Sequence, residues 1–400
     1  MHPIFPLLAI FPHCLLPIAY CHSSDTPLPS SAIESIRVHQ VIDAMESAIL
    51  KADVGAYMAL VDPSDSFFTT EQRAWISDLQ SHPVDDVEII IAWNESITLE
   101  SEGLAIAPIE ISWHVPGEEL DRHFAYDALF KPIGSPDGRW VFAGRAWEIE
   151  DTETPGVRVY ADGVHEDLAY LAADRVAILR QTIAQNMGIE SEAQPTQEIV
   201  VKVYPDMDSL QASIYLSYTD PLSGWNEPGE SIKILGREKF PQARLDPLLA
   251  HEIGHSVSFE FGDQINNAPW WTLEGIAEVS AGLFRDSWAS KNKRIVGMAK
   301  NDNLRDWALL ADFRGEASNH ARHVYIQGWS MIDYIDRIYA VEKRNEWFIR
   351  LGVGDTLDQA TRSVIGIGFD ELDANWRASL IEWVEPESEP ASEPESEPES

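Results

Sequence analysis

Two histidines four residues apart, His251 and His255, flank Glu252 in the stretch HEIGH. On a helix, side chains four apart lie one above the other on one face, so both imidazoles can reach one metal ion. Glu252 is rotated by about 100° from His251 on such a helix, which places its carboxylate beside the ion and not on it. This spacing is typical of zinc hydrolases in which the glutamate acts as a base on water.

The stretch LEGIAE supplies two further carboxylates, Glu274 and Glu278, about two dozen residues later. Their spacing puts both on one face of a second helix. Glu274 can add an oxygen ligand to the two imidazoles, which gives the three protein ligands of a catalytic zinc site. Glu278, one turn further, can accept the second N–H of a histidine ligand. A solvated or ion-paired surface acid remains the alternative for Glu278.

HEIGH followed by the tryptophan-rich WWTLEGIAE resembles the gluzincin metallopeptidases of the thermolysin-like peptidase MA clan. Its collagenase-like and peptidase MA-like members are the most similar group, and the resemblance spans about residues 155–381. It implies one catalytic Zn²⁺ held by His251, His255 and Glu274. It also implies that Glu252 is the general base of peptide-bond hydrolysis and that Glu278 orients a ligand.

In that group a tyrosine or histidine on the downstream helices often donates a hydrogen bond to the oxyanion. Tyr325 is the first candidate here and His323 the second, and a core or surface role is the alternative for each. The stretch GWNEPGESIKIL is expected to run along the cleft as an edge strand, on which a peptide substrate pairs. Trp225 and Trp271 are candidates to line the cleft, with plain core as the alternative. No GxMEN-type stretch is present, which favours an endopeptidase over an aminopeptidase.

The elements that must position these residues begin near residue 157. VRVYA, EIVVKVYP and SIKILG predict strands, and a long helix is expected from about Glu166 to Met187. In the HEIGH helix, Asp246 is expected to cap, Pro247 to lie in the first turn, and Gly262 to mark the end. Thr272 is expected to cap the LEGIAE helix, and helices are expected to dominate the rest of the chain.

The preceding region, about residues 34–150, changes from helical to strand periodicity. A helix is expected over 36–61 and a second over TTEQRAWISDLQ, followed by strand-like runs with SPDGRW as a hairpin signal. This α+β order resembles the cone-shaped nuclear-transport-factor-2-like and ketosteroid-isomerase-like domains, with a scaffold role as the alternative to ligand binding. The polar stretch DTETPGV at 151–157 is expected to separate the two domains.

Composition restricts the partners and the location. A formal net charge of −37 disfavours association with nucleic acid and anionic lipid. Residues 1–22 resemble a secretory signal, so we expect a secreted or extracytoplasmic protein without a membrane span or an internal disulfide. A lipid anchor on Cys21 is disfavoured because Tyr20 precedes it. The acidic Glu/Pro/Ser tail over 382–400 is expected to be disordered.

Four hypotheses follow from these patterns. A zinc endopeptidase explains the largest set of residues, because ligands, base and orienting carboxylate share compatible helix faces. A zinc-binding protein without peptidase activity, in which the first domain binds a ligand, is the alternative. A salt-bridged surface helix without metal and a small-molecule isomerase based on residues 34–150 are two further alternatives.

Overall fold

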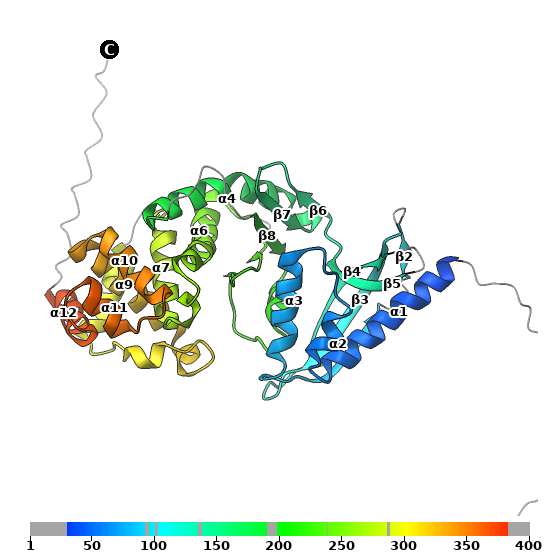
Figure 1. The fold of residues 1–400 in the computed structure, drawn as a ribbon, viewed down its shortest axis with the longest axis horizontal. Helices are drawn as coiled ribbons and strands as arrows, with labels where there is room; N and C mark the ends of the chain where they lie inside the picture. The colour runs from blue at the N-terminus through cyan, green and yellow to red at the C-terminus, as the bar shows by residue number, and fades with distance from the viewer. Residues whose placement is uncertain are drawn as a thin grey trace, which may run out of the picture.

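The computed structural model describes residues 30–92, 96–100, 103–134, 138–189, 198–237, 239–285 and 289–382. Within them the chain is a mixed α+β fold with two five-stranded sheets, arranged side by side along the long axis of the molecule (Figure 1). The predicted leader, both cysteines and the predicted tail after residue 382 lie outside the described residues. In the described part, no helix has the length and apolar character needed to cross a membrane.

The first sheet is antiparallel and is covered by the three N-terminal helices. Its strand order is β1-β3-β4-β5, and β2 pairs with β3. Buried and partly exposed residues alternate along β3, which is the pattern of a strand with one face on the core. The elements are α1 (Ser30–Ile49), α2 (Val54–Met58), α3 (Ser66–Asp78), β1 (Asp85–Ile91), β2 (Thr98–Leu99), β3 (Ala105–His114), β4 (Arg122–Ile133) and β5 (Arg139–Arg145).

The single helix expected over 36–61 is two helices, and that prediction was wrong. The chain leaves the helix after Ile49, Ala52 has a φ of 47°, and Asp53 caps α2 by accepting a hydrogen bond from the amide of Ala56. The second predicted helix, α3, begins before its two threonines because Asp65 caps it. Three residues of the predicted SPDGRW hairpin, 135–137, lie outside the described residues.

The second sheet has the order β6-β7-β8-β10-β9. Its central strand β8 is buried at every position, as expected for a strand with parallel neighbours that is covered on both faces. The helix α4 crosses from β7 to the parallel strand β8. The elements are β6 (Ile149–Asp151), β7 (Val157–Ala161), α4 (Glu166–Asn186), β8 (Ile199–Tyr204), α5 (Met207–Ile214), β9 (Gly224–Trp225) and β10 (Ile232–Leu235).

The junction predicted at 151–157 is part of this second sheet. Strand β6 pairs antiparallel with β7, from Ile149 opposite Ala161 to Asp151 opposite Val159, so most of DTETPGV forms the turn of a hairpin. The chain passes between the sheets at 146–148 instead. The polar and Pro/Gly-containing composition of the stretch fits both a linker and a hairpin turn, so composition alone does not separate them.

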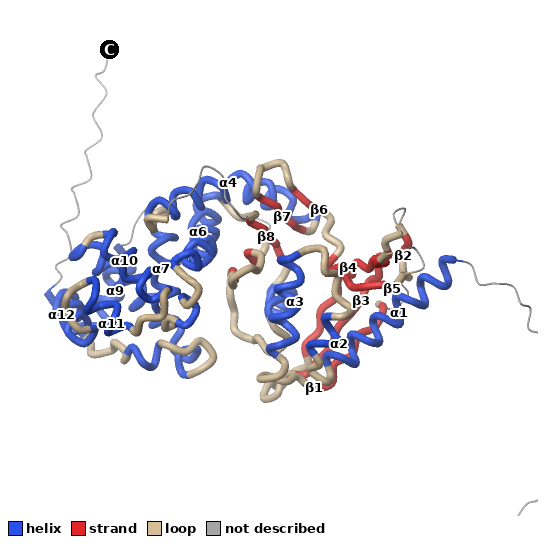
Figure 2. The backbone as a smooth tube through the Cα atoms, in the orientation of Figure 1, coloured by secondary structure: helices blue, strands red, loops and turns tan. Residues whose placement is uncertain are grey.

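Helices follow the second sheet and form the half of the molecule without strands in Figure 2. They are α6 (Gln242–Ser258), α7 (Trp270–Gly282), α8 (Ala289–Lys300), α9 (Ala321–Tyr339), α10 (Val341–Gly352), α11 (Leu357–Val364) and α12 (Phe369–Glu382). Helix α7 packs between α6 and α9 through buried apolar faces. This packing fixes the orientation of the two helices that carry HEIGH and LEGIAE.

The predicted starts of these two helices were wrong. Helix α6 begins at Gln242, and Asp246 lies inside it, where its carboxylate forms an ion pair with Arg175 at 2.9 Å. Helix α7 begins at Trp270, and the hydroxyl of Thr272 donates to the carbonyl of Pro269 instead of capping the amides. Both side chains found tertiary or local partners that compete with capping.

Candidate functional site

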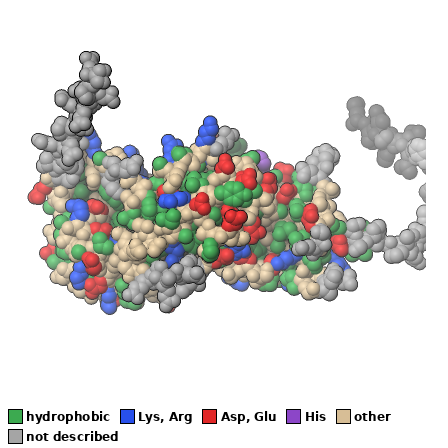
Figure 3. Space-filling view, turned by 90° about the horizontal axis from the view of Figure 1, so that it is seen from above, with side chains coloured by type: hydrophobic (Ala, Val, Ile, Leu, Met, Phe, Trp, Pro, Cys, Tyr) green, Lys and Arg blue, Asp and Glu red, His purple; other side chains and the backbone are tan. Residues whose placement is uncertain are grey.

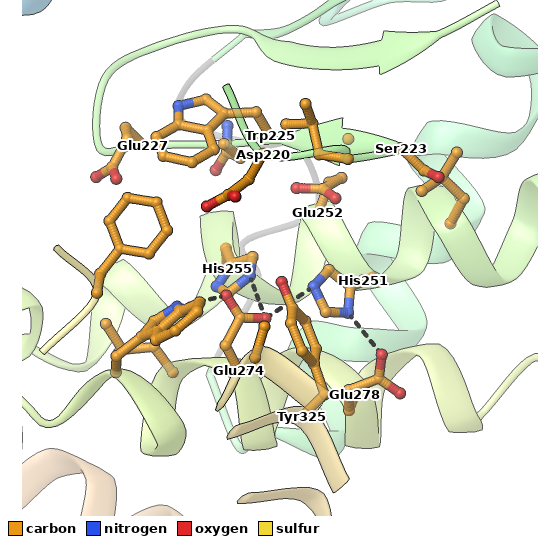
Figure 4. Close-up of a pocket in the computed structure, with 18 of the residues that line it drawn as sticks. Asp220, Ser223, Trp225, Glu227, His251, Glu252, His255, Glu274, Glu278 and Tyr325 are labelled. Atoms are coloured by element: carbon orange, nitrogen blue, oxygen red, sulfur yellow. Dashed lines mark hydrogen bonds and ion pairs between the residues drawn. The ribbon is translucent and has the colours of Figure 1, made fainter. Parts of the chain in front are cut away.

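Helices α6 and α7 bring three side chains to one point. The Nε2 atom of His251 lies 3.2 Å from Oε2 of Glu274, and Nε2 of His255 lies 3.6 Å from the same oxygen. One potential ligand atom from each residue lies within 4.8 Å of the others. Figure 4 shows all three side chains pointing into one pocket. We call His251, His255 and Glu274 the ligand cluster.

The chemistry of this cluster fits a divalent metal ion. Two imidazole nitrogens and one carboxylate oxygen form a common three-ligand donor set that leaves a coordination position open. Glu274 Oε2 is buried and, within the described residues, has no hydrogen-bonding partner of good geometry, although both histidines face it. Its other oxygen accepts a hydrogen bond of 2.8 Å from the indole N–H of Trp270, which holds the carboxylate in place.

Glu278 contacts His251 of the ligand cluster on the side of its ring away from Glu274. Its Oε1 lies 3.3 Å from Nδ1 of His251, as expected for a carboxylate that orients a metal-binding imidazole. Its Oε2 is bound by Arg285 at 3.1 Å and by Lys291. Glu278 is therefore buried and not solvated, but it is ion-paired, as the alternative also allowed.

Glu252 lies beside the cluster and under the edge strand β9. A Cβ atom built on Gly224 would lie 2.4 Å from Glu252 Oε1, so any other residue here would force the Glu252 side chain to shift. Burial raises the pKa of Glu252 above its usual range, against the opposing effect of His251 and His255. A carboxylate with a raised pKa is a stronger base than an ordinary glutamate, which suits it to accept a proton from water.

The pKa values of two ligand-cluster residues, Glu274 and His251, shift in opposite directions. Burial would raise the pKa of Glu274, but His255 and His251 lower it below its ordinary value. Burial would lower the pKa of His251, but Glu274 and Glu252 raise it. The buried carboxylate of Glu274 thus favours a positive charge beside it, which a divalent cation would supply.

The cluster forms part of the floor of a cleft of about 1260 Å³. Strand β9 forms the opposite wall as the edge of the second sheet, pairing antiparallel with β10. Trp225 lines the cleft, as predicted. Trp271 does not, because its indole is fully buried against Trp307 with ring centroids 4.2 Å apart. The neighbouring Trp270 lines the cleft in its place.

The two candidate oxyanion donors lie in different environments. Tyr325 lines the cleft, and its ring centroid is 5.9 Å from that of His251. Burial, Glu274 and Glu252 raise the pKa of Tyr325 well above its ordinary value, so its hydroxyl remains a donor. His323 lies outside the cleft lining and its Nε2 is 3.1 Å from the carbonyl of Asn303. The structure brings Tyr325 to the cluster and leaves His323 apart from it.

Three contributions to the site were not predicted from the sequence. Trp270 bonds Glu274, Gly224 admits Glu252, and Lys291 neutralises Glu278. The doublet WW and the motif LEGIAE predicted the helix that carries Glu274. The sequence did not indicate which of the two indoles, Trp270 or Trp271, contacts the site. Gly224 lies in a stretch expected to be a loop and strand, where a glycine carries no special signal.

No known family matches the chain, and no curated protein sequence matches it either.

Proposed function

We propose that this protein is a zinc-dependent peptidase of the gluzincin type. The observation that carries the proposal is the convergence of His251, His255 and Glu274 with Glu252 directly beside them and an edge strand opposite. An open edge strand can pair with the backbone of an extended peptide. The second unit would then be a gluzincin domain, and residues 34–150 a nuclear-transport-factor-2-like domain.

Each side chain has a separate role in this proposal. His251, His255 and Glu274 would hold the ion, which supplies Lewis-acid activation of water and of the scissile carbonyl. Glu252 accepts a proton from the attacking water and passes it to the leaving amine. Glu278 keeps the imidazole of His251 oriented. The protonated hydroxyl of Tyr325 donates a hydrogen bond to the tetrahedral oxyanion.

A peptide-library digest tests this proposal directly. We expect the zinc-loaded protein to cleave peptides internally, a chelator to abolish cleavage, and added zinc to restore it. Glu252→Gln keeps the shape of the side chain and should lower kcat by about 10²-fold or more without loss of bound zinc. Cleavage that survives this substitution, or purified protein that binds no stoichiometric zinc, would contradict the proposal.

A second candidate function has its own observation. A cavity of about 400 Å³ lies where the first sheet meets the second, and its lining combines aromatic and aliphatic side chains with charged ones such as Arg145. Its size fits a small amphipathic ligand, which favours ligand binding by the first domain over a pure scaffold role. A ligand screen by thermal shift on the full chain tests it, and Ser213→Phe, which fills the cavity, should abolish any hit.

A further inference from the structure

The cleft has a carboxylate that the proposed reaction does not use. Glu227 lies in the turn between β9 and β10 and lines the cleft (Figure 4), on the wall opposite the ligand cluster. Among the described residues, no side chain bonds or ion-pairs with the Glu227 carboxylate. Glu230 in the same turn differs, because Lys233 neutralises it at 2.6 Å. One of the two turn carboxylates therefore has a protein cation and the other has none.

The surroundings make an unpaired charge at Glu227 unfavourable. Burial and the nearby Glu230 raise the pKa of Glu227 to about 7. The adjacent Asn226 adds a second acceptor, since its Oδ1 is buried and has no hydrogen-bonding partner in the described residues. Two neighbouring acceptors without donors on a cleft wall indicate that a donor from outside the chain belongs there.

Aromatic rings stand beside these acceptors. Trp225 lies 5.5 Å from Phe313 and 5.5 Å from Tyr218 between ring centroids, and Phe313 lies 4.9 Å from Trp270. All four residues line the cleft. Aromatic faces attract ammonium and guanidinium groups, and a carboxylate next to them strengthens the attraction.

One face of this aromatic group already binds a cation. The guanidinium of Arg314 lies 5.7 Å from the ring centre of Phe313 and 5.0 Å from that of Tyr215. Asp78 neutralises Arg314 at 2.9 Å, so Arg314 adds little net repulsion. Arg314 thus occupies one side of this aromatic group. On the side that faces the cleft, the described residues place no cation against the rings.

Charge also differs between the two ends of the cleft. Strand β10 runs antiparallel to β9, so Arg237, which follows β10, lies beyond the Ser223 end and away from Glu227. Arg285 binds Glu278, which Figure 4 also shows on the side away from Glu227. Because Glu278 neutralises Arg285, a bound peptide meets Arg237 at one end and the Glu227 carboxylate at the other, and this asymmetry can fix its direction.

We infer that Glu227, with Asn226, Trp225 and Phe313, forms a subsite for a cationic group of the substrate, either an α-ammonium or a lysine or arginine side chain. This inference rests on the proposed peptidase function and deepens it by naming a substrate class. Glu227 accepts hydrogen bonds from the cation, and the rings contact its faces. Occupation of the subsite places the bond to be cleaved over the ligand cluster.

Binding to zinc-loaded Glu252→Gln protein, measured by calorimetry, tests the subsite without requiring hydrolysis. One peptide pair is an alanine pentapeptide amide with a free or an acetylated amino terminus. The other is an acetylated pentapeptide amide with a central lysine or a central glutamine. We expect the charged member of at least one pair to bind about tenfold more tightly. The pair that shows the preference identifies the source of the cation.

Two further variants decide whether Glu227 is responsible. Glu227→Gln keeps the side-chain volume and should reduce the affinity ratio to about one. The control Asp220→Asn removes an equal charge from an exposed position in the same cleft and should leave the ratio intact. Equal binding within both pairs, a preference that survives Glu227→Gln, or its equal loss in Asp220→Asn would overturn the inference.

The same peptides separate this inference from the proposed function. If wild-type protein binds the cationic peptides selectively but hydrolyses none of them, the peptidase proposal fails and the subsite stands. If wild-type protein cleaves charged and neutral peptides with the same kcat/KM, the subsite fails and the peptidase proposal stands.

Discussion

Glu278 contacts His251 on one side and Arg285 and Lys291 on the other. Glu278→Gln keeps the shape but weakens the acceptor for the imidazole N–H and leaves two cations unneutralised. Because partners of this kind set ligand orientation and basicity, we expect zinc affinity to fall by about 10- to 100-fold. Competition with a chromophoric chelator measures the zinc affinity. Glu260→Gln, at an exposed carboxylate just after α6, is the control and should leave zinc affinity unchanged.

Substitutions can distinguish Tyr325 from His323, the two residues predicted from the sequence as candidate oxyanion donors. Tyr325→Phe removes only the hydroxyl, and we expect kcat to fall by about 10²-fold or more with KM little changed. His323→Gln should keep kcat within a few-fold of wild type, because His323 lies outside the cleft. The high pKa of Tyr325 also means that activity should show no alkaline loss from this hydroxyl near neutral pH. Steady-state kinetics on one cleaved peptide would show the opposite order if the assignment were reversed.

The ligand residues could be predicted because their relation is local. His251 and His255 are one turn apart on one helix, as are Glu274 and Glu278, so helix geometry alone puts each pair on one face. Gly224 and Lys291 could not be predicted in the same way, because each contacts a residue on another element and such contacts depend on how the elements pack. Trp270 lies one turn before Glu274 on α7, so helix geometry does put the two on one face. Its residue type did not mark it, because an indole is not a metal ligand.

At the scale of elements, the closest approach in the site region is between α7 and α9. A Cβ atom on Gly328 would lie 2.2 Å from the carbonyl oxygen of Trp271, which is backbone and cannot move aside. Gly328→Ala therefore has to push α9, which carries Tyr325, away from α7, which carries Glu274. Overpacking of this kind costs about 1–3 kcal/mol of the free energy of unfolding, and activity should fall with it.

Urea unfolding and kcat on the same variant measure both effects. Gly297→Ala is the matched control, since it lies inside helix α8 and a Cβ there meets nothing within 4 Å. We expect this control to gain about 0.4–1 kcal/mol and to keep its activity. Wild-type stability and kcat in Gly328→Ala would show that the α7–α9 contact does not position the site.

Element types were easier to predict than element ends. The elements predicted over 157–161, 166–187 and 198–205 are β7, α4 and β8, and their observed bounds differ by one residue at most. The starts of α6 and α7 were missed because a capping residue was assigned by type alone. Asp246 is of a residue type that often caps helices, but its partner is Arg175 on α4. No local sequence pattern predicts this ion pair.

At the scale of the whole molecule, the α+β class could be predicted from the change between helical and strand periodicity along the chain. The contact between the two sheets could not be predicted from that periodicity. The chain has a net charge of −37, and its acidic side chains are scattered over the face seen in Figure 3. Their distribution therefore does not mark the surface through which the two units contact each other. The contact combines apolar burial, since Ala212 and Leu216 pack into the apolar core of the first unit, with a few buried polar groups. Trp75 and Trp113 of the first unit donate to backbone carbonyls of Ala212 and Leu216, residues that sequence periodicity assigned to the second unit.

Glu71 is the charged centre of that contact. It extends from α3 to Lys202 on β8 at 2.5 Å, to Lys233 on β10 at 3.7 Å, and to the amide of Ser231 at 3.0 Å. Glu71→Gln removes the carboxylate that pairs with the buried ammonium group of Lys202, and it leaves Lys233 with Glu230 alone. We expect a loss of about 3–5 kcal/mol in the free energy of unfolding at pH 7, measured by urea denaturation. Glu88→Gln, on the exposed side of β1, should change stability by less than about 0.5 kcal/mol.

The pH dependence of stability distinguishes the charge of Glu71 from its packing. Burial would raise the pKa of Glu71, but Lys202 and Lys233 lower it from 4.5 to about 2. A carboxyl with a depressed pKa in the folded state stabilises the protein above its unfolded pKa, and that contribution is lost as the pH falls toward the folded value. The stability difference between wild type and Glu71→Gln should therefore be full above about pH 5 and shrink progressively toward pH 2. A difference that stays constant over this range would mean that Glu71 joins the two sheets through its shape and hydrogen bonds, and not through its charge.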